Sequence, residues 1–443
     1  MKKNIMARAI AIALMATPLA GFASEADLLK RLDKLSAELE QLKAELAATK
    51  QKTDTVEKRQ EALATAAPAT PVAPLAAAAP AAPAESASAS MLGPRTVLSS
   101  YGEVNYTRPT KDASKAEADV ARAVIGITHR FDDKTKMVAE FEWEHAVTSA
   151  SDKGETEVEQ LYVEREFNNG LRAKGGLFLI PAGLINTNHE PTAYFGVHRN
   201  FVETAIIPST WREAGLGLSS TLDNGLTWDT GLTTGFDLTK WDSKSTDGRD
   251  SPLFSIHQEG QQAKGRDLSV YGALNWRGVP GLLLGGSVFT GKAGHKTADF
   301  AAQDARVTLW DLHARYTPGK WDLSAVYARG TISNTEALNQ TFAGNPTPVP
   351  SSFYGWYTQA AYQLWKTSDY TLTPFVRFEK FNTANSYSAM PAGLEFATGP
   401  AEKVWTTGIN FNIGEGVVIK ADYQKFKEDK TRDRLDLGLG YSF

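Results

Sequence analysis

From residue 95 to the end of the chain, apolar and polar side chains alternate at every second position in one segment after another. The final segment places Leu435, Leu437 and Leu439 on one face and Arg434 and Asp436 on the other. The same alternation runs through residues 137–145, 171–179 and 309–316. A period of two is typical of β-strands that have one apolar and one wet face. This pattern predicts an all-β fold for the region.

Turn signals divide these segments into pairs. Clusters of Gly, Asn, Asp and Pro predict seven tight turns, at 132–134, 168–170, 223–225, 278–281, 318–320, 366–369 and 414–416. Eight longer connections alternate with them, near 107–119, 146–157, 181–213, 237–266, 291–304, 330–352, 382–402 and 427–433. Short turns that alternate with long loops are typical of a transmembrane β-barrel, which must close because lipid cannot pair a sheet edge. We therefore predict a transmembrane antiparallel β-barrel of about 16 strands over residues 95–443.

Aromatic residues and the chain terminus agree with a barrel. Tryptophan and tyrosine lie near the strand ends on the apolar faces, as expected for girdles at two membrane interfaces. The set comprises Trp143, Trp228, Trp276, Trp310, Tyr316, Trp321, Trp356, Tyr370, Trp405 and Tyr441. The last residue, Phe443, ends an alternating strand. A secreted β-sandwich or propeller is the alternative, but neither needs aromatics at both ends or a long loop at every second connection.

The first 94 residues have three different compositions. Residues 1–23 read as a secretory signal peptide, with Lys2, Lys3 and Arg8 before an apolar stretch. Residues 24–63 carry leucines at alternating steps of four and three between charged residues, which predicts a self-associating coiled coil. Residues 64–94 are rich in Ala, Pro and Ser and predict an extended linker. A coiled-coil helix and a linker therefore precede the barrel.

Composition excludes several classes of function. The chain has no cysteine, which rules out disulfide scaffolds, thiolate zinc sites and iron–sulfur clusters. The formal net charge is −4, whereas a nucleic-acid-binding domain is usually strongly basic. His189-Glu190-Pro191 lacks the second histidine of a helical zinc motif. The sequence predicts no metal, no cofactor and no nucleic-acid partner.

The connection at 181–213 has an unusual composition for a surface loop. It mixes apolar residues such as Phe195, Phe201 and Trp211 with charged residues such as Glu190 and Arg199. Apolar side chains need cover from water, so we expect this loop to fold against the inner wall and narrow the pore. Packing on a neighbouring subunit is the alternative.

A family resemblance rests on residues 175–217. The stretches Leu177 to Gly183, Phe195 to Arg199 and Ile206 to Trp211 resemble the phosphate-selective porin O and P superfamily, which includes DcaP-like channels. The resemblance implies a trimeric outer-membrane porin of a Gram-negative cell, with the coil as a periplasmic stem. It also implies contact with outer-membrane lipid and lipopolysaccharide. It does not name the solute.

Strand parity directs similar numbers of bases and acids into the lumen, which departs from the arginine ladder of a strictly phosphate-selective pore. The acids gather on the third and fourth strands. We predict a transverse field that aligns small organic anions against Arg172, Lys174 and Arg199 or Arg212. The candidate residues for the constriction or for solute binding are Arg122, Glu140, Glu142, Arg172, Lys174, His198, Arg199, Arg212, Arg315, Arg377 and Lys420.

The predicted function is passive diffusion of small solutes through a water-filled channel, with preference for small anions such as phosphate or carboxylates. An outer-membrane tether or adhesin that uses the barrel as an anchor is the alternative. An enzyme would need a site, and only Asp311 and His313 with a distant serine suggest one. That spacing is not distinctive, so we predict no enzymatic activity.

Overall fold

The computed structural model describes residues 95–149, 151–391, 393 and 395–443. The described residues all belong to one compact unit. The predicted signal peptide, coiled coil and linker lie outside the described residues. No helix in the described part of the chain is long and apolar enough to cross a bilayer.

This unit is one antiparallel sheet of sixteen long strands and one two-residue strand, β13 (Trp365–Lys366). The first eight long strands are β1 (Thr96–Pro109), β2 (Glu117–Arg130), β3 (Thr135–Glu144), β4 (Glu155–Glu166), β5 (Arg172–Leu179), β6 (Arg212–Thr221), β7 (Leu226–Thr233) and β8 (Ser269–Trp276). The other eight are β9 (Leu282–Lys292), β10 (Arg306–Tyr316), β11 (Trp321–Ser333), β12 (Ser352–Tyr362), β14 (Tyr370–Ser386), β15 (Glu402–Ile413), β16 (Val417–Phe426) and β17 (Arg434–Ser442).

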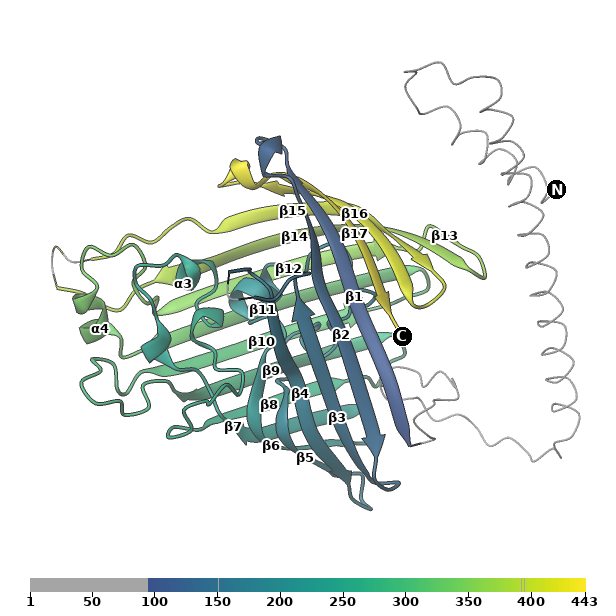
Figure 1. Cartoon of the computed structure of the whole chain (residues 1–443), viewed down its shortest axis with the longest axis horizontal. Coiled ribbons are helices and arrows are strands. Elements are labelled where there is room, and N and C mark those ends of the chain that lie inside the picture. Colours follow the sequence, from purple (N-terminus) through teal and green to yellow (C-terminus); the bar gives the residue numbers. More distant parts are fainter. Residues whose placement is uncertain (1–94, 150, 392, 394) are drawn as a thin grey trace, which may run out of the picture. The chain divides into compact units, whose positions relative to one another are not determined.

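The sheet closes because β1 pairs with both β2 and β17 (Figure 1). At the seam the Ser100 N–H donates to the Phe443 carbonyl at 3.0 Å, and the Phe443 N–H donates back at 2.9 Å. Closure leaves no unpaired edge for lipid. The predicted closed barrel of sixteen membrane strands is therefore confirmed, and β13 is a short addition inside the connection between β12 and β14.

Short turns and long connections lie at opposite ends of the barrel, which we call the turn end and the loop end. All seven predicted tight turns join strands of a hairpin. Gly225 and Gly414 occupy the left-handed region there, with φ of +82° and +62°, a conformation that favours glycine. Short helices occur only in long connections of the described chain: η1 (Ala113–Lys115), η2 (Val202–Ile206), η3 (Leu238–Lys240), α3 (Asp247–Asp250), η4 (Phe254–Ile256), α4 (Glu336–Thr341) and η5 (Lys430–Arg432).

Alternation in the sequence becomes a lipid face and a lumen face. Leu435, Leu437 and Leu439 of β17 are 49, 55 and 50% exposed, whereas Asp436 between them is 1% exposed. Aromatic pairs cover the outer surface near the turn end, including Trp321 with Tyr362. This is the distribution that lipid on one side and polar groups on the other require.

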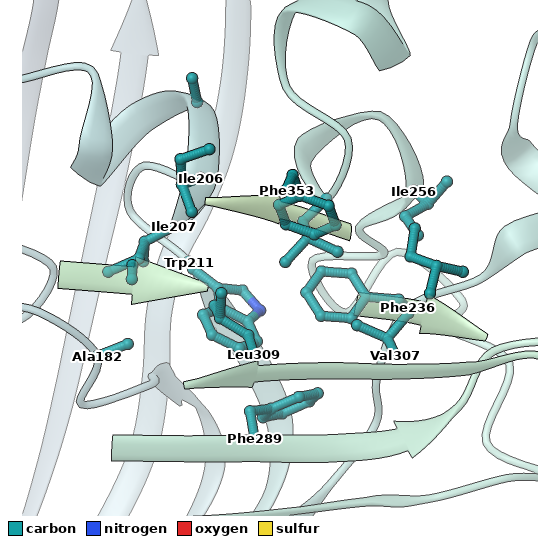
Figure 2. Packing of buried hydrophobic residues seen from close by; sticks show 14 of the residues in the cluster. Ala182, Ile206, Ile207, Trp211, Phe236, Ile256, Phe289, Val307, Leu309 and Phe353 are labelled. Atoms are coloured by element: carbon teal, nitrogen blue, oxygen red, sulfur yellow. The ribbon is translucent and has the colours of Figure 1, made fainter. Parts of the chain in front are cut away.

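The interior is more apolar than strand parity predicts. Figure 2 shows Trp211 packed between side chains of the connections and inward-facing side chains of β9, β10 and β12. The Trp211 ring lies 5.2 Å from that of Phe236 and 4.6 Å from that of Phe289. Phe353, of β12, belongs to the same cluster. The expectation that every inward position meets water is therefore wrong here, because two long connections enter the barrel and need an apolar wall.

Candidate functional site

The segment joining β5 and β6, residues 180–211, forms an inner loop. Its two ends meet through Asn186, whose side-chain amide donates to the carbonyls of Ile180 at 2.7 Å and Trp211 at 2.9 Å. The Asn186 side-chain oxygen accepts the Trp211 N–H at 2.7 Å. This side chain is 3% exposed and all its polar groups are paired, so the base of the loop is fixed.

The far part of the inner loop contacts strands on the other side of the ring. The Val197 N–H donates to Asp422 of β16 at 2.6 Å, and the Phe201 N–H donates to Glu379 of β14 at 2.7 Å. Strand parity alone would count Asp422 and Glu379 as free lumen acids. Both are instead acceptors that attach the loop to the wall, and charge-assisted bonds of this kind are among the stronger ones.

Glu203, in η2, organises the loop from within. Its carboxylate accepts hydrogen bonds from the Leu184 N–H at 2.6 Å and the Ile185 N–H at 2.9 Å. The Asn200 amide and the Tyr357 hydroxyl donate to its second oxygen at 2.8 and 2.9 Å. Burial raises the pKa of Glu203, although these donors favour the ionised form. A loop residue that sequence reasoning did not single out therefore joins three parts of the site.

A cavity of about 300 Å³ lies on the loop-end side of the inner loop. Among its lining residues are the guanidinium groups of Arg122, Arg199 and Arg434 and the carboxylates of Glu103, Glu117 and Asp119, with His198 and Tyr194 between them. Three bases therefore face three acids in one chamber, which is the opposed arrangement of charge that tunes selectivity in channels.

The acids of this chamber are mostly engaged. Arg122 donates to Glu103 at 2.9 Å and to Glu142 at 3.2 Å. The Tyr194 hydroxyl donates to the second oxygen of Glu103 at 2.8 Å. Asp119 contacts His145 at 2.8 Å. Of the three carboxylates, only Glu117 has no ion pair within the described residues.

Arg199 has a different environment from Arg122. Its guanidinium donates to the hydroxyls of Ser209 and Thr210, the latter at 2.7 Å, and to the His189 carbonyl at 3.2 Å. It forms no hydrogen bond with a carboxylate among the described residues, and its Nε is buried without a partner. The positive charge of Arg199 is therefore not cancelled by a direct neighbour.

Lys420 of β16 is the second such cation. It is 2% exposed, and its ammonium nitrogen lies 3.6 Å from the centre of the Tyr194 ring. No hydrogen-bond partner for this nitrogen exists among the described residues, although Glu103 and Asp422 act on it through space. Tyr194 thus stands between Lys420 and the chamber, a role that sequence reasoning missed because it assigned no function to the loop's tyrosine.

Arg315 and Arg377 line a second, smaller cavity of about 30 Å³, which Tyr194 also borders. Arg315 forms a bidentate pair with Asp322, at 3.0 and 2.6 Å. Arg377 donates to Glu379 at 2.8 Å and to the Phe195 carbonyl at 3.1 Å.

The remaining candidates do not gather in one row. Lys174 pairs with Asp229 at 3.1 Å. Arg212 pairs with Glu157 at 2.5 Å and with Glu259 at 3.0 Å. Arg172 forms no ion pair within the described residues. Wall acids and the β7–β8 connection therefore engage Lys174 and Arg212, two of the four bases in the predicted transverse field.

The last two candidates are His198, which lines the chamber, and Glu140, which does not. His198 contacts the Thr107 hydroxyl at 3.0 Å and Asp436 at 3.5 Å. Glu140 on β3 accepts a hydrogen bond from Gln160 and lies near Glu159 and His189. The strand-parity picture included Glu140 and Glu142 but not Glu159.

The geometry around His313 does not form a nucleophilic site. His313 contacts Asp311 at 2.6 Å and Asn275 at 2.8 Å. The Ser287 hydroxyl donates to Asp311 rather than to the imidazole. A serine nucleophile needs a base in contact with its hydroxyl, and this serine has a carboxylate that is already shared with a histidine.

Comparisons with known proteins agree with the fold. No family model matches the chain. An uncharacterized protein of Aquifex aeolicus (strain VF5) is 26% identical over 352 residues, which cover 77% of this chain and 79% of that protein. OmpF of Salmonella typhi, solved in complex with daunomycin, has a TM-score of 0.53 and 15% identity, over 79% of this chain and 97% of that one. The outer membrane channel DcaP of Acinetobacter baumannii has a TM-score of 0.48 and 13% identity, over 79% and 97%.

The closed sixteen-strand barrel and its likeness to OmpF define the class: the chain has the fold of an outer-membrane porin.

Proposed function

We propose that the protein is an outer-membrane porin that conducts small hydrophilic solutes by passive diffusion and prefers small anions, such as phosphate or organic carboxylates. The observation that carries the proposal is the unequal use of lumen charges around the inner loop. Asp422 and Glu379 accept backbone N–H groups of the loop. Arg199 and Lys420 form no hydrogen bond with a carboxylate of the described chain.

This inequality favours anions on physical grounds. A carboxylate that already accepts hydrogen bonds has fewer free lone pairs for a passing cation. A guanidinium or ammonium group without a direct counter-ion offers its donors to a carboxylate or phosphate. In a narrow, partly desolvated passage such contacts are stronger than in bulk water. In the chamber a solute would meet Arg199 directly, and Lys420 would act from behind the Tyr194 ring.

The finer assignments are also proposals. We infer membership of the phosphate-selective porin O and P superfamily, or its DcaP-like branch, from residues 175–217. The same inference makes residues 24–63 a periplasmic stem that holds a homotrimer, surrounded by lipid and lipopolysaccharide. Deletion of residues 25–63 followed by measurement of trimer resistance to SDS tests the stem.

A tether or adhesin is the second candidate, and the apolar filling of the interior around Trp211 is the observation that favours it. Single-channel recording in planar bilayers separates the two candidates. A porin gives discrete openings, in groups of three for a trimer, whereas a tether gives none.

Liposome swelling then ranks solutes: we expect succinate and phosphate to enter faster than neutral sugars of similar size. Absence of conductance would contradict the porin proposal.

A further inference from the structure

Three ligand-type side chains from separate parts of the chain meet beside the inner loop. Glu140 of β3, Glu159 of β4 and His189 of the inner loop each place one oxygen or nitrogen atom within 4.8 Å of the other two. Glu159 is fully buried and His189 is 5% exposed. The loop and two strands thus converge on one point that is distinct from the chamber of Arg199.

The imidazole of His189 has the orientation of a metal ligand. Its Nδ1 lies 3.1 Å from the Asn186 carbonyl, which only accepts, so Nδ1 carries a hydrogen. This leaves Nε2 3.8 Å from Glu159 and 2.7 Å from the Tyr101 oxygen, and because the Tyr101 hydrogen goes to Glu159, a bound ion would replace the hydrogen that Nε2 donates to Tyr101. A hydrogen bond from one ring nitrogen to a carbonyl is the usual way to orient the other toward a metal ion.

Glu159 supplies an unpaired, buried acceptor. One carboxylate oxygen accepts from the Tyr101 hydroxyl at 2.7 Å, but the other, Oε1, is buried with no hydrogen-bond partner in the described chain. Buried polar atoms are normally satisfied, and an exception indicates an absent partner such as an ion. This oxygen is the one that lies 3.8 Å from His189 Nε2.

An irregularity in the sheet directs Glu159 to this point. Along β3 and β4, Glu140 pairs with Gln160 and Phe141 pairs with Val158, so Glu159 is the extra residue of a β-bulge. A bulge re-aims a side chain and is common beside functional sites. The bulge therefore adds a carboxylate to the side of the barrel where Glu140 and Glu142 already face inward.

Charge is also unbalanced here. Arg122 hydrogen-bonds Glu142, whereas within the described residues Glu140 has no ion pair and Glu159 has only His189, at 3.8 Å, which is a cation only when protonated. Neighbouring buried carboxylates need a cation or a shared proton. We propose that Glu140, Glu159 and His189 bind a divalent cation of borderline hardness, represented by Zn²⁺, and so attach the inner loop to β3 and β4.

The donor set suits that class of ion. One imidazole and two carboxylates match the nitrogen and oxygen donors that zinc takes, and zinc sites with three protein ligands leave a fourth position for water. Two ligand atoms at about 2.1 Å from one tetrahedral ion lie about 3.4 Å apart. Small rotations of the carboxylates therefore suffice to reach coordination from the observed spacing.

Metal content per folded barrel tests the proposal. Full-length protein without a tag is stripped with EDTA, dialysed against micromolar Zn²⁺ and measured by inductively coupled plasma mass spectrometry. We expect about one zinc per chain for the native sequence and background values for Glu159→Gln and His189→Gln. His145→Gln is the matched control, because His145 is also a loop histidine beside a carboxylate, Asp119, but is only half-buried. It should keep its zinc.

A second measurement reports attachment of the loop. The midpoint of heat-induced unfolding in SDS gels should rise with Zn²⁺ in the native protein and in His145→Gln, but not in Glu159→Gln or His189→Gln. If Glu159→Gln or His189→Gln does not fold into a barrel with heat-modifiable migration, Glu140→Gln is measured in its place, because Glu140 is the most exposed of the three ligands. Background zinc in the native protein, or zinc that survives both substitutions or is lost only in His145→Gln, would overturn the proposal.

Discussion

The ammonium group of Lys420 on β16 is covered by the ring of Tyr194 on the inner loop, with 3.6 Å between nitrogen and ring centre. A cation over an aromatic face is attracted by the negative face of the ring quadrupole. The contact joins the wall to the loop and places the ammonium nitrogen directly behind the Tyr194 ring. Tyr194 also donates to Glu103, so the same side chain orders a cation and an anion.

Removal of the Lys420 charge should weaken anion preference. In Lys420→Met we expect the anion-to-cation permeability ratio to fall about twofold, because a unit charge about 8 Å away across water is worth ~0.5 kcal/mol. Reversal potentials measured in a salt gradient give the ratio. Lys320→Met, an exposed lysine at the turn end, is the control and should not change it. If the permeability ratio of Lys420→Met equals that of the native protein, Lys420 does not contribute to ion selectivity.

Attachment of the loop to Asp422 should depend on an acceptor oxygen rather than on charge. Asp422→Asn keeps an oxygen for the Val197 N–H, whereas Asp422→Ala removes it and leaves a buried donor unpaired, at a cost of ~1–3 kcal/mol. We expect faster trypsin cleavage after Arg199 in the alanine variant and near-native cleavage in the asparagine variant. Equal cleavage of both variants would contradict a docking role for this oxygen.

The apolar cluster should dominate the stability of the interior. Trp211→Ala removes a 1% exposed ring that contacts Phe236 and Phe289, and we expect a loss of ~3–5 kcal/mol. Urea unfolding in detergent, followed by loss of heat-modifiable migration, measures it. Trp405→Ala, at a position 54% exposed on the lipid face, serves for comparison and should lose less.

Acid should release the connection between β7 and β8 from Arg212. Burial opposes ionisation of Glu259, yet its hydrogen bond to His257 and the charge of Arg212 hold its pKa below the usual value. A carboxyl group whose pKa is lower in the folded protein than in the unfolded chain stabilises the fold. This stabilisation is fully present at pH values above the unfolded pKa and is lost as the pH falls through the folded pKa. We expect amide hydrogen exchange of residues 257–264, corrected for the intrinsic rate, to accelerate between about pH 6 and about pH 3. In Glu259→Gln this pH dependence should disappear.

The strands and turns of the barrel wall can be predicted from the sequence, but the contacts inside the barrel cannot. Leu435, Asp436 and Leu437 alternate in a way that only a half-buried strand explains, and the turn residues mark where each strand ends. The role of Asp422 follows from a contact with Val197, 225 positions away. No local pattern encodes such a contact, so Asp422 resembles a free lumen charge. Glu159 was missed for a related reason. A one-residue bulge turns its side chain inward, whereas the strict alternation of β4 would place it on the lipid face.

Ion selectivity of the open channel tests the central claim most directly. The native protein is placed in a planar lipid bilayer with a tenfold KCl gradient, and the potential at zero current is measured. The account predicts a reversal potential of the sign given by chloride permeation, reduced in Lys420→Met. A potential of the sign given by potassium permeation would contradict it.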